Sequence, residues 1–277
     1  MKTTKDFQRM GDEWRNVAGS IYRAIRPTAS MTLLGETYRV RSEARGGGED
    51  RDYAVLKSLA RGKRCIFDVG ANVGRTALVM GNNSMADNGQ IYAFEASEAA
   101  CRLIRDNVAL NGLDERVTVV NALIAERSGL TLDFYADAAS GSSSIIPGYL
   151  DHHRPMQKVT LALDDFVLAT DCVPDLIKID VEGAELRVLA GLTQAMQTAR
   201  PLIFVELHSW GDILLVEQAR GALELLEPLD YGLIYLRTKE VVADPAVFAG
   251  RGRCHVVVCP NDSSCLNEVM ELDTTGL

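Results

Sequence analysis

One stretch decides the fold of this chain: Cys65-Ile66-Phe67-Asp68-Val69-Gly70-Ala71-Asn72-Val73-Gly74-Arg75-Thr76. Its first five residues are typical of a short buried strand, and a helical pattern begins after the second glycine. A strand that passes through such a turn into a helix places bare backbone N–H groups at the carboxyl edge of a sheet, where α/β proteins bind ligands. The stretch therefore predicts an α/β fold with a ligand site at residues 68–74.

Outward from this turn, short apolar strands alternate with helical patterns, which is typical of a mostly parallel sheet with helices on both faces. The predicted strands are Arg64–Val69, Gln90–Glu95, Val117–Ala122, Leu176–Asp180 and Leu202–Leu207, and the predicted helices lie near Val73–Met80, Glu98–Asn111, Ala184–Leu192 and Ile213–Leu226. Two further strands, Leu130–Tyr135 and Lys158–Leu163, flank a loop rich in Ser and Gly. No crossing helix separates Tyr231–Arg237 from Cys254–Cys259, so we expect these two to pair antiparallel.

The first 50 residues have a different pattern. Apolar spacings of three and four from Phe7 to Ile25 predict a helix that ends at Pro27. A short hairpin is expected over Met31–Val40, and Gly46-Gly47-Gly48 marks a boundary near residue 50. We therefore divide the chain into an extension over 1–50, a sheet domain over 51–260 and a polar tail over 261–277. The apolar face of the helix fits its own domain or a second subunit, and we predict a homo-oligomer contact there.

Composition excludes several classes of protein. The 277 residues are 47% hydrophobic and 24% charged, and 29 basic residues against 38 acidic ones give a net charge of −9. No basic patch is present to offset the repulsion of a phosphate backbone, so we expect no nucleic-acid partner. The apolar stretches are shorter than the roughly 18 to 20 residues that cross a bilayer, and the N-terminus has no continuous apolar core of a signal peptide. A cytoplasmic protein without a membrane span is expected.

The glycine turn does not fit phosphate-binding motifs. A dinucleotide fingerprint has glycine where Asn72 stands, and a P-loop has a lysine after its last glycine, where this chain has Arg75. The carboxylate of Asp68 favours a cationic group instead, and Glu95, at the end of the second strand, suits the two hydroxyls of a ribose. A nucleoside with a free ribose diol, an ammonium group and no phosphate is S-adenosylmethionine.

Several ordered motifs resemble the FkbM family of S-adenosylmethionine-dependent methyltransferases. The resemblance runs from about Arg64 to His208 and rests on Asp68–Gly74, Ala93–Glu95, Asn107 to Gly112, Gly141–Ser144, Leu161–Phe166, Leu176–Glu185, and Arg200-Pro201 leading to Val205-Glu206. It implies the class I methyltransferase fold, a Rossmann-like sheet of seven strands with the last one antiparallel. Residues 1–50 show nothing of the family.

The resemblance also implies cofactor-binding residues. Those that would cradle the methionine end are Asp68, Gly70, Ala71, Asn72 and Gly74. Glu95 would hold the ribose, Ala96 would follow the adenosine, and Ala122 and Leu123 would lie against adenine. The two glycines also suit a plain helix entry without a ligand, and Ala122 and Leu123 also suit ordinary core packing.

Methyl transfer is a displacement at carbon in which the cofactor supplies the electrophile, so the protein aligns an acceptor and removes the proton of a hydroxyl. A base near the donor methyl is therefore needed. The fourth and fifth strands end in Asp180-Val181-Glu182 and Glu206-Leu207-His208, and strand alternation sends Glu206 and His208 to the same side. His208 is the predicted base, titrating near neutrality if unperturbed, with Glu206 or Asp180 orienting it or the acceptor.

Each of these residues also has a plainer interpretation. Asp180 suits the methionine amino group, Glu182 suits the first turn of a helix, and His208 suits a half-buried strand end. Asp180, Glu182 and Glu206 together would also suit an all-oxygen Mg²⁺ site, although three carboxylates prove no metal. The loop around Ser140–Pro147 is long enough to cover the acceptor or to be a plain surface loop.

The leading hypothesis is O-methylation of a hydroxyl on a small molecule such as a sugar, glycoside or polyketide-like product. An N-methyltransferase is the nearest alternative, because a neutral amine needs no strong base. A non-catalytic cofactor-binding or assembly protein is the alternative from another class. An NAD-dependent oxidoreductase is disfavoured by Asn72.

Overall fold

The computed structural model describes residues 27–45, 52–82, 85–136, 143–146 and 154–275. The predicted helix over residues 7–25, with its predicted subunit contact, lies outside these residues. So do the triple glycine and most of the loop around Ser140–Pro147.

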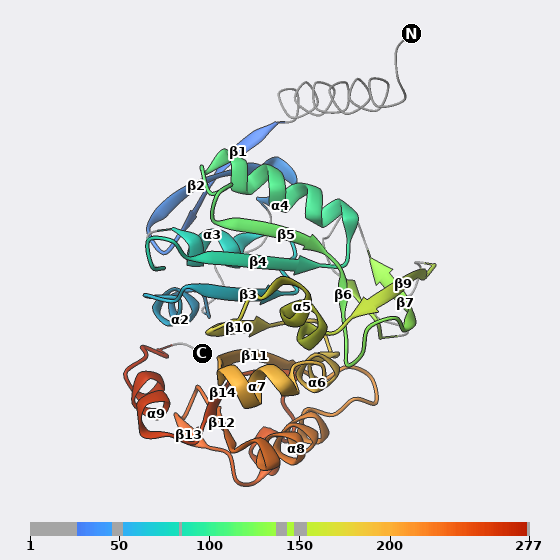
Figure 1. Cartoon of the computed structure of the whole chain (residues 1–277), viewed down its shortest axis with the longest axis vertical. Coiled ribbons are helices and arrows are strands. Elements are labelled where there is room, and N and C mark those ends of the chain that lie inside the picture. Colours follow the sequence, from blue (N-terminus) through green and yellow to red (C-terminus); the bar gives the residue numbers. More distant parts are fainter. Residues whose placement is uncertain (1–26, 46–51, 83–84, 137–142, 147–153, 276–277) are drawn as a thin grey trace.

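The main sheet has eight strands in the order β13-β12-β14-β11-β10-β3-β4-β5 (Figure 1). They are β3 (Cys65–Val69), β4 (Gln90–Glu95), β5 (Val117–Asn121), β10 (Leu176–Ile179), β11 (Leu202–His208), β12 (Tyr231–Tyr235), β13 (Glu240–Val241) and β14 (Arg253–Pro260). The five predicted strands from β3 to β11 are parallel to one another, and β14 lies antiparallel between β11 and β12. The class I methyltransferase fold is confirmed. The strand count differs by one, because the two-residue β13 pairs with the edge strand β12.

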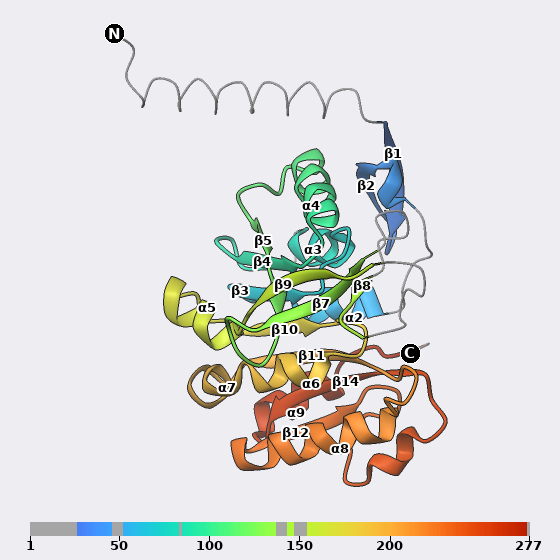
Figure 2. The same ribbon diagram turned by 90° about the vertical axis from the view of Figure 1, so that its right-hand side faces the viewer.

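Helices cover both faces of this sheet, as predicted (Figures 1 and 2). One hydrophobic core contains residues of α2 (Asp52–Leu59), α3 (Arg75–Gly81), α4 (Glu98–Leu110) and α9 (Ser263–Met270). The other contains residues of α5 (Leu163–Thr170), α6 (Glu185–Ala190), α7 (Thr193–Ala199) and α8 (Leu215–Leu226). None of the helices in the described part of the chain has the length and apolar character to cross a membrane.

The predicted hairpin forms from β1 (Thr28–Leu33) and β2 (Glu36–Arg41). The turn residues Leu34 and Gly35 both have positive φ, as a two-residue hairpin turn with the right twist requires. Arg41 binds the hairpin to α4: its Nε lies 2.9 Å from Asp106, and its backbone N–H donates to the Asn107 side chain at 2.8 Å. The hairpin therefore packs on the sheet domain, and the boundary near residue 50 stays a prediction.

A second, four-stranded sheet stands beyond the carboxyl ends of β4 and β5 (Figure 1). Its strands are β6 (Leu123–Ile124), β7 (Thr131–Ala136), β8 (Ser143–Ser144) and β9 (Met156–Leu161). β7 and β9, both predicted, pair antiparallel. The prediction ended the later strand two residues too far on, because α5 already begins at Leu163.

The segment expected as a polar tail contains α9. Two of its apolar residues fill the core, since Val269 and Leu272 are buried. Lys239 Nζ donates to the carbonyl oxygens of Met270 and Leu272 at 2.9 and 2.6 Å, which holds the end of the helix. Sparse apolar positions concealed this packing in the sequence.

Candidate active site

The glycine turn lies between β3 and α3, where the sequence places it. Gly70, Asn72 and Gly74 all have positive φ. The backbone N–H groups of Gly70 and Ala71 donate to the Phe94 carbonyl oxygen at 3.0 and 3.1 Å, which joins the turn to β4. A Cβ atom on Gly70 would overlap the Asp180 carbonyl oxygen, so only glycine allows the turn to approach β10 this closely.

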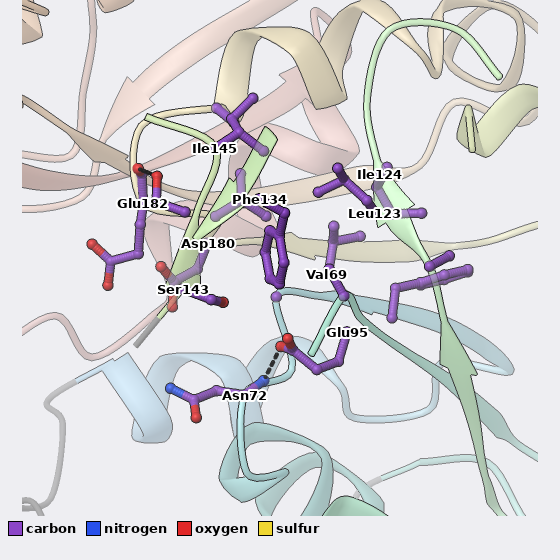
Figure 3. A pocket seen from close by; sticks show the side chains of 17 residues that line it. Val69, Asn72, Glu95, Leu123, Ile124, Phe134, Ser143, Ile145, Asp180 and Glu182 are labelled. Carbon is purple, nitrogen blue, oxygen red and sulfur yellow. Dashed lines mark hydrogen bonds between the residues drawn. The ribbon is translucent and has the colours of Figure 1, made fainter. Parts of the chain in front are cut away.

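A pocket of about 610 Å³, including the open space at its mouth, begins at this turn. Its wall consists of Val69, Gly70, Asn72, Phe94, Glu95, Ala96, Ala122, Leu123, Ile124, Phe134, Ser143, Ser144, Ile145, Asp180, Val181, Glu182 and Ala184. Seven of the predicted cofactor-binding residues lie on this wall: Gly70, Asn72, Glu95, Ala96, Ala122, Leu123 and Asp180. In Figure 3 the apolar Leu123 and Ile124 lie on one side of Phe134, and Asp180 and Glu182 lie on the other.

Glu95 is a hydrogen-bond acceptor on the pocket wall, and backbone N–H groups hold its carboxylate in place. Its buried carboxylate accepts a hydrogen bond from the backbone N–H group of Asn72 at 2.9 Å (Figure 3). It accepts a second one from the backbone N–H group of Ser97 at 2.7 Å. Burial raises the pKa of Glu95 to about 7, against the opposing effect of these two bonds and of Lys178. A carboxylate oxygen has more than one lone pair, so each one retains capacity for a ligand hydroxyl.

Asp68, Ala71 and Gly74 do not line the pocket. Asp68 is fully buried, accepts a 2.6 Å hydrogen bond from Thr76 Oγ1, and lies 3.4 Å from Lys178 Nζ. Its negative charge is therefore matched within the protein. Ala71 is buried, and Gly74 contributes to packing, since a Cβ there would lie 3.1 Å from Ile104.

Lys178 is a central residue that the sequence analysis missed. It lies directly opposite Asp68 in the β3–β10 pair, and its Nζ is 3.3 Å from Asp180 and donates to the Gly70 carbonyl oxygen at 3.0 Å. Burial opposes its charge, but Asp180 and Asp68 outweigh that effect and raise the pKa of Lys178. A lysine within the apolar strand Leu176–Ile179 is the signal that could have identified it.

The second sheet contributes further residues to the pocket, and the sequence analysis assigned none of them individually. Phe134 of β7 and Ser144 of β8 are buried on the wall, and Ile145 follows β8. Ser144 Oγ donates to the Glu182 carbonyl oxygen at 2.8 Å, which ties β8 to the loop after β10. Ser143, Ser144 and Ile145 belong to the loop around Ser140–Pro147, for which the sequence left open a place over the acceptor, whereas nothing local indicated that Phe134 would meet the pocket.

The four predicted catalytic residues meet at the carboxyl ends of β10 and β11. His208 Nδ1 lies 2.9 Å from Glu185 Oε1, and its Nε2 faces three carboxylates. The distances from Nε2 are 3.6 Å to Glu182, 3.7 Å to Glu206 and 4.0 Å to Asp180. Glu185, which is fully buried, is the partner of His208 that the sequence analysis did not assign.

The charge of His208 differs from the prediction. Burial alone would lower its pKa, but Glu185, Asp180 and Glu182 raise the pKa of His208 to about 9. His208 is therefore mainly an imidazolium at neutral pH and cannot accept a proton in that form. Burial also raises the pKa of Asp180, whereas His255, His208 and Arg253 outweigh burial and lower the pKa of Glu206 to about 2.

Residues 68–231 match the methyltransferase FkbM domain. The chain is also similar to the hexuronic acid methyltransferase AglP of Haloferax volcanii, with 25% identity over 185 residues that cover 66% of this chain and 71% of AglP.

Two solved structures are among those similar to this one. The methyltransferase FkbM from Methylobacillus flagellatus KT has 15% identity and a TM-score of 0.45, over 72% of this chain and 44% of that one, so this chain spans less than half of its length. The TYW2 protein of M. jannaschii in complex with AdoMet has 16% identity and a TM-score of 0.47, over 84% of each chain. Because the domain match covers more than half of its length, the chain belongs to the FkbM family of methyltransferases.

Proposed function

We propose that this chain transfers the methyl group of S-adenosylmethionine to an oxygen atom of a small polar acceptor, with sugar acids as the first class to test. The single observation that carries the proposal is the continuity of the pocket: it runs from the Glu95 carboxylate to Asp180 and Glu182 at the end of β10. Membership of a methyltransferase family supports the reaction, and the name of AglP supports a sugar acid.

The donor set of the pocket fits this cofactor. Glu95 offers carboxylate lone pairs that suit a ribose diol, and Gly70 lets the turn pass directly against the backbone of Asp180, so that both lie on the same pocket wall. The apolar residues Leu123, Ile124 and Phe134 suit an adenine ring, and Asp180 suits an ammonium group. When bound, the cofactor supplies a methyl group on a positively charged sulfur, which reacts by direct displacement.

The acceptor would approach from the ends of β10 and β11. A hydroxyl acceptor must lose its proton, and His208 can take that proton only in its neutral form. With His208 as base, the rate on a hydroxyl acceptor is therefore expected to rise with pH toward about 9. His208→Gln should lower that rate and remove the rise. A rate independent of His208 at every pH would contradict the base role.

The acidic surroundings of His208 also give specific support to an amine acceptor. Asp180, Glu182 and Glu206 would attract an ammonium group, and a neutral amine needs no base. The deciding experiment incubates the chain and S-adenosylmethionine with hexuronic acids, neutral sugars and amino sugars. Mass spectrometry should detect the gain of one methyl group on oxygen. Methylation confined to nitrogen would replace O-transfer, and full cofactor affinity without turnover would indicate a non-catalytic protein.

The cofactor assignment has its own test. Glu95→Ala should abolish the calorimetric signal of S-adenosylmethionine binding, because the pocket loses its fixed acceptor. Asp68→Ala should weaken binding less, because Asp68 acts through Lys178 and does not line the pocket. Unchanged binding in both variants would show that the cofactor assignment is wrong.

A further inference from the structure

The orientation of His208 is fixed from behind by a buried carboxylate. Glu185 Oε1 accepts the Gly183 backbone N–H at 2.9 Å and lies 2.9 Å from His208 Nδ1. An ionised carboxylate only accepts hydrogen bonds, so Nδ1 carries a hydrogen and donates it. In the neutral ring this leaves the lone pair on Nε2, which lies on the side of Asp180 and Glu182.

The distances from His208 Nε2 to the oxygens of Glu182 and Asp180 suit a shared metal ion better than direct hydrogen bonds. Nε2 is 3.6 Å from a Glu182 oxygen and 4.0 Å from an Asp180 oxygen, which is too far for hydrogen bonding. The three ligand atoms of Asp180, Glu182 and His208 all lie within 4.8 Å of one another. Two ligands at about 2.1 Å from one ion are about 3.0–3.6 Å apart, so a small closure would complete the set. Side-chain exposure of 29% for Asp180 and 39% for Glu182 allows that closure.

The concentration of carboxylates at the same place is a second observation. Four carboxylates surround His208, namely Asp180, Glu182, Glu185 and Glu206. The fully buried Glu185 has a second oxygen, Oε2, with no hydrogen-bond partner. Lys178 is shared with Asp68, and Arg253, which pairs with Glu206 at 2.9 Å, is 62% exposed. The buried carboxylate of Glu185 favours positive charge beside it, either on His208 or on an ion bound to His208.

We propose that Asp180, Glu182 and His208 Nε2 bind one divalent transition-metal ion, with Glu185 as the residue that orients His208. One imidazole and two carboxylates suit Mn²⁺, Co²⁺ or Zn²⁺ better than the all-oxygen site expected for Mg²⁺. A carboxylate on the far ring nitrogen is the usual partner of a metal-binding histidine.

This assignment changes the predicted metal set. Glu206 is replaced by His208, because Arg253 and His255 already pair with Glu206. Asp52, Glu206 and His255 form a second group of suitable spacing in the described residues. We favour the first group because Asp180 and Glu182 line the pocket, whereas Asp52 and Glu206 are buried.

The consequence for catalysis rests on the proposed function, whereas ion binding does not. An ion at this place would lower the pKa of an acceptor hydroxyl and so remove the need for a neutral His208. The acceptor proton leaves to solvent, the oxygen forms a bond to the methyl carbon, and the carbon–sulfur bond breaks with its electron pair on sulfur. The positive charge of the ion would also let an anionic sugar acid approach the carboxylates at this end of the pocket.

Mn²⁺ binding to the full chain, stripped of metal and free of cofactor, tests the site. Calorimetry and the electron paramagnetic resonance signal of free Mn²⁺ should show one ion bound per chain. Glu182→Gln and His208→Gln should each weaken binding at least about tenfold. Glu185→Gln should weaken it about tenfold or more by releasing His208. The matched controls, Glu217→Gln at an exposed position of α8 and His255→Gln in the second group, should stay within about twofold of the unmodified chain.

Three results would overturn the inference: no binding of Mn²⁺, Co²⁺ or Zn²⁺; unchanged affinity in both Glu182→Gln and His208→Gln; or loss of binding in His255→Gln alone. Circular dichroism of every variant excludes misfolding as the cause of lost affinity. Ion binding without methyl transfer to any acceptor would support this site and contradict the proposed function. Methyl transfer by a chain that binds no ion would overturn the site and leave the proposed function intact.

Discussion

The two ends of the pocket differ in the chemical groups that surround them. The end formed by β3, β4 and the glycine turn uses backbone N–H groups, apolar side chains and the single carboxylate Glu95. At the other end, Asp180 and Glu182 line the wall. They belong to a group of charged side chains at the ends of β10, β11 and β14 that face one another: Lys178, Asp180, Glu182, His208, Glu206 and Arg253. The first end depends on shape, and the second depends on a balance of charge.

This difference predicts different sensitivities. Shape is lost when an atom is added where the backbone passes closely, because packed atoms cannot move far. Charge balance is lost when one partner is removed, because the remaining charge stays buried without compensation. Substitutions at the two ends should therefore fail in distinguishable ways.

Gly70→Ala should have the largest effect. The added Cβ would overlap the Asp180 carbonyl oxygen, and the positive φ of Gly70 adds strain. We expect a loss of about 4 kcal/mol or more of unfolding free energy in urea denaturation. Gly112→Ala is the matched control: it also has positive φ but has no atom within 4 Å of the added Cβ, so it should cost about 1–2 kcal/mol. Equal losses would show that close packing at Gly70 is unimportant.

Lys178→Met breaks the charge balance. It leaves Asp68 and Asp180 without their buried cation and should cost about 3–5 kcal/mol of unfolding free energy. Adding Asp68→Asn should recover part of this loss, since one of the two uncompensated charges is then removed. Urea denaturation of the two single variants and the double variant measures the coupling. If the changes in unfolding free energy of the two single variants add up to that of the double variant, the pairing of Lys178 with Asp68 is contradicted.

Glu95→Gln keeps the shape of the first end and removes its charge. We expect S-adenosylmethionine to bind about 10- to 100-fold more weakly, in line with about 1.5–3 kcal/mol for a hydrogen bond to a charged group. Isothermal titration calorimetry measures this change. The unfolding free energy should change much less than in Lys178→Met, because no buried cation of the described residues lies at hydrogen-bonding distance from Glu95.

The smallest expected effect is a pH dependence of cofactor binding. Burial raises the pKa of Glu95 to about 7, so the carboxylate form is lost as the pH falls through 7. If the ribose requires that form, affinity should fall about fivefold between pH 7.0 and pH 6.0. Calorimetry at these two pH values checks the slope, and Glu95→Gln should remove it. A slope that persists in Glu95→Gln would place the titrating group elsewhere.

Much of the fold was predictable because its signals are local. Apolar runs such as Leu202–Leu207, separated by helical patterns, predicted the parallel strands and the helices on both faces. The missing crossing helix predicted the antiparallel β14. α9 was not predicted, because few apolar residues of that region reach a distant core: among the described side chains, Val269 and Leu272 are buried there and Leu266 packs against that core. The edge strand β13 was missed because two residues show no period.

The sequence by itself determined the chemistry available at each strand end: a glycine turn after β3, Glu95 as the last residue of β4, Asp180 and Glu182 after β10, and His208 as the last residue of β11. These assignments depend on residue type and on the direction of parallel strands, both of which are local. The tertiary structure decided which charges meet. It turned Asp68 away from the pocket toward Lys178, brought Phe134 onto the wall, and set Glu185 behind His208. Charge state and orientation depend on distant neighbours and burial, which only the folded chain supplies.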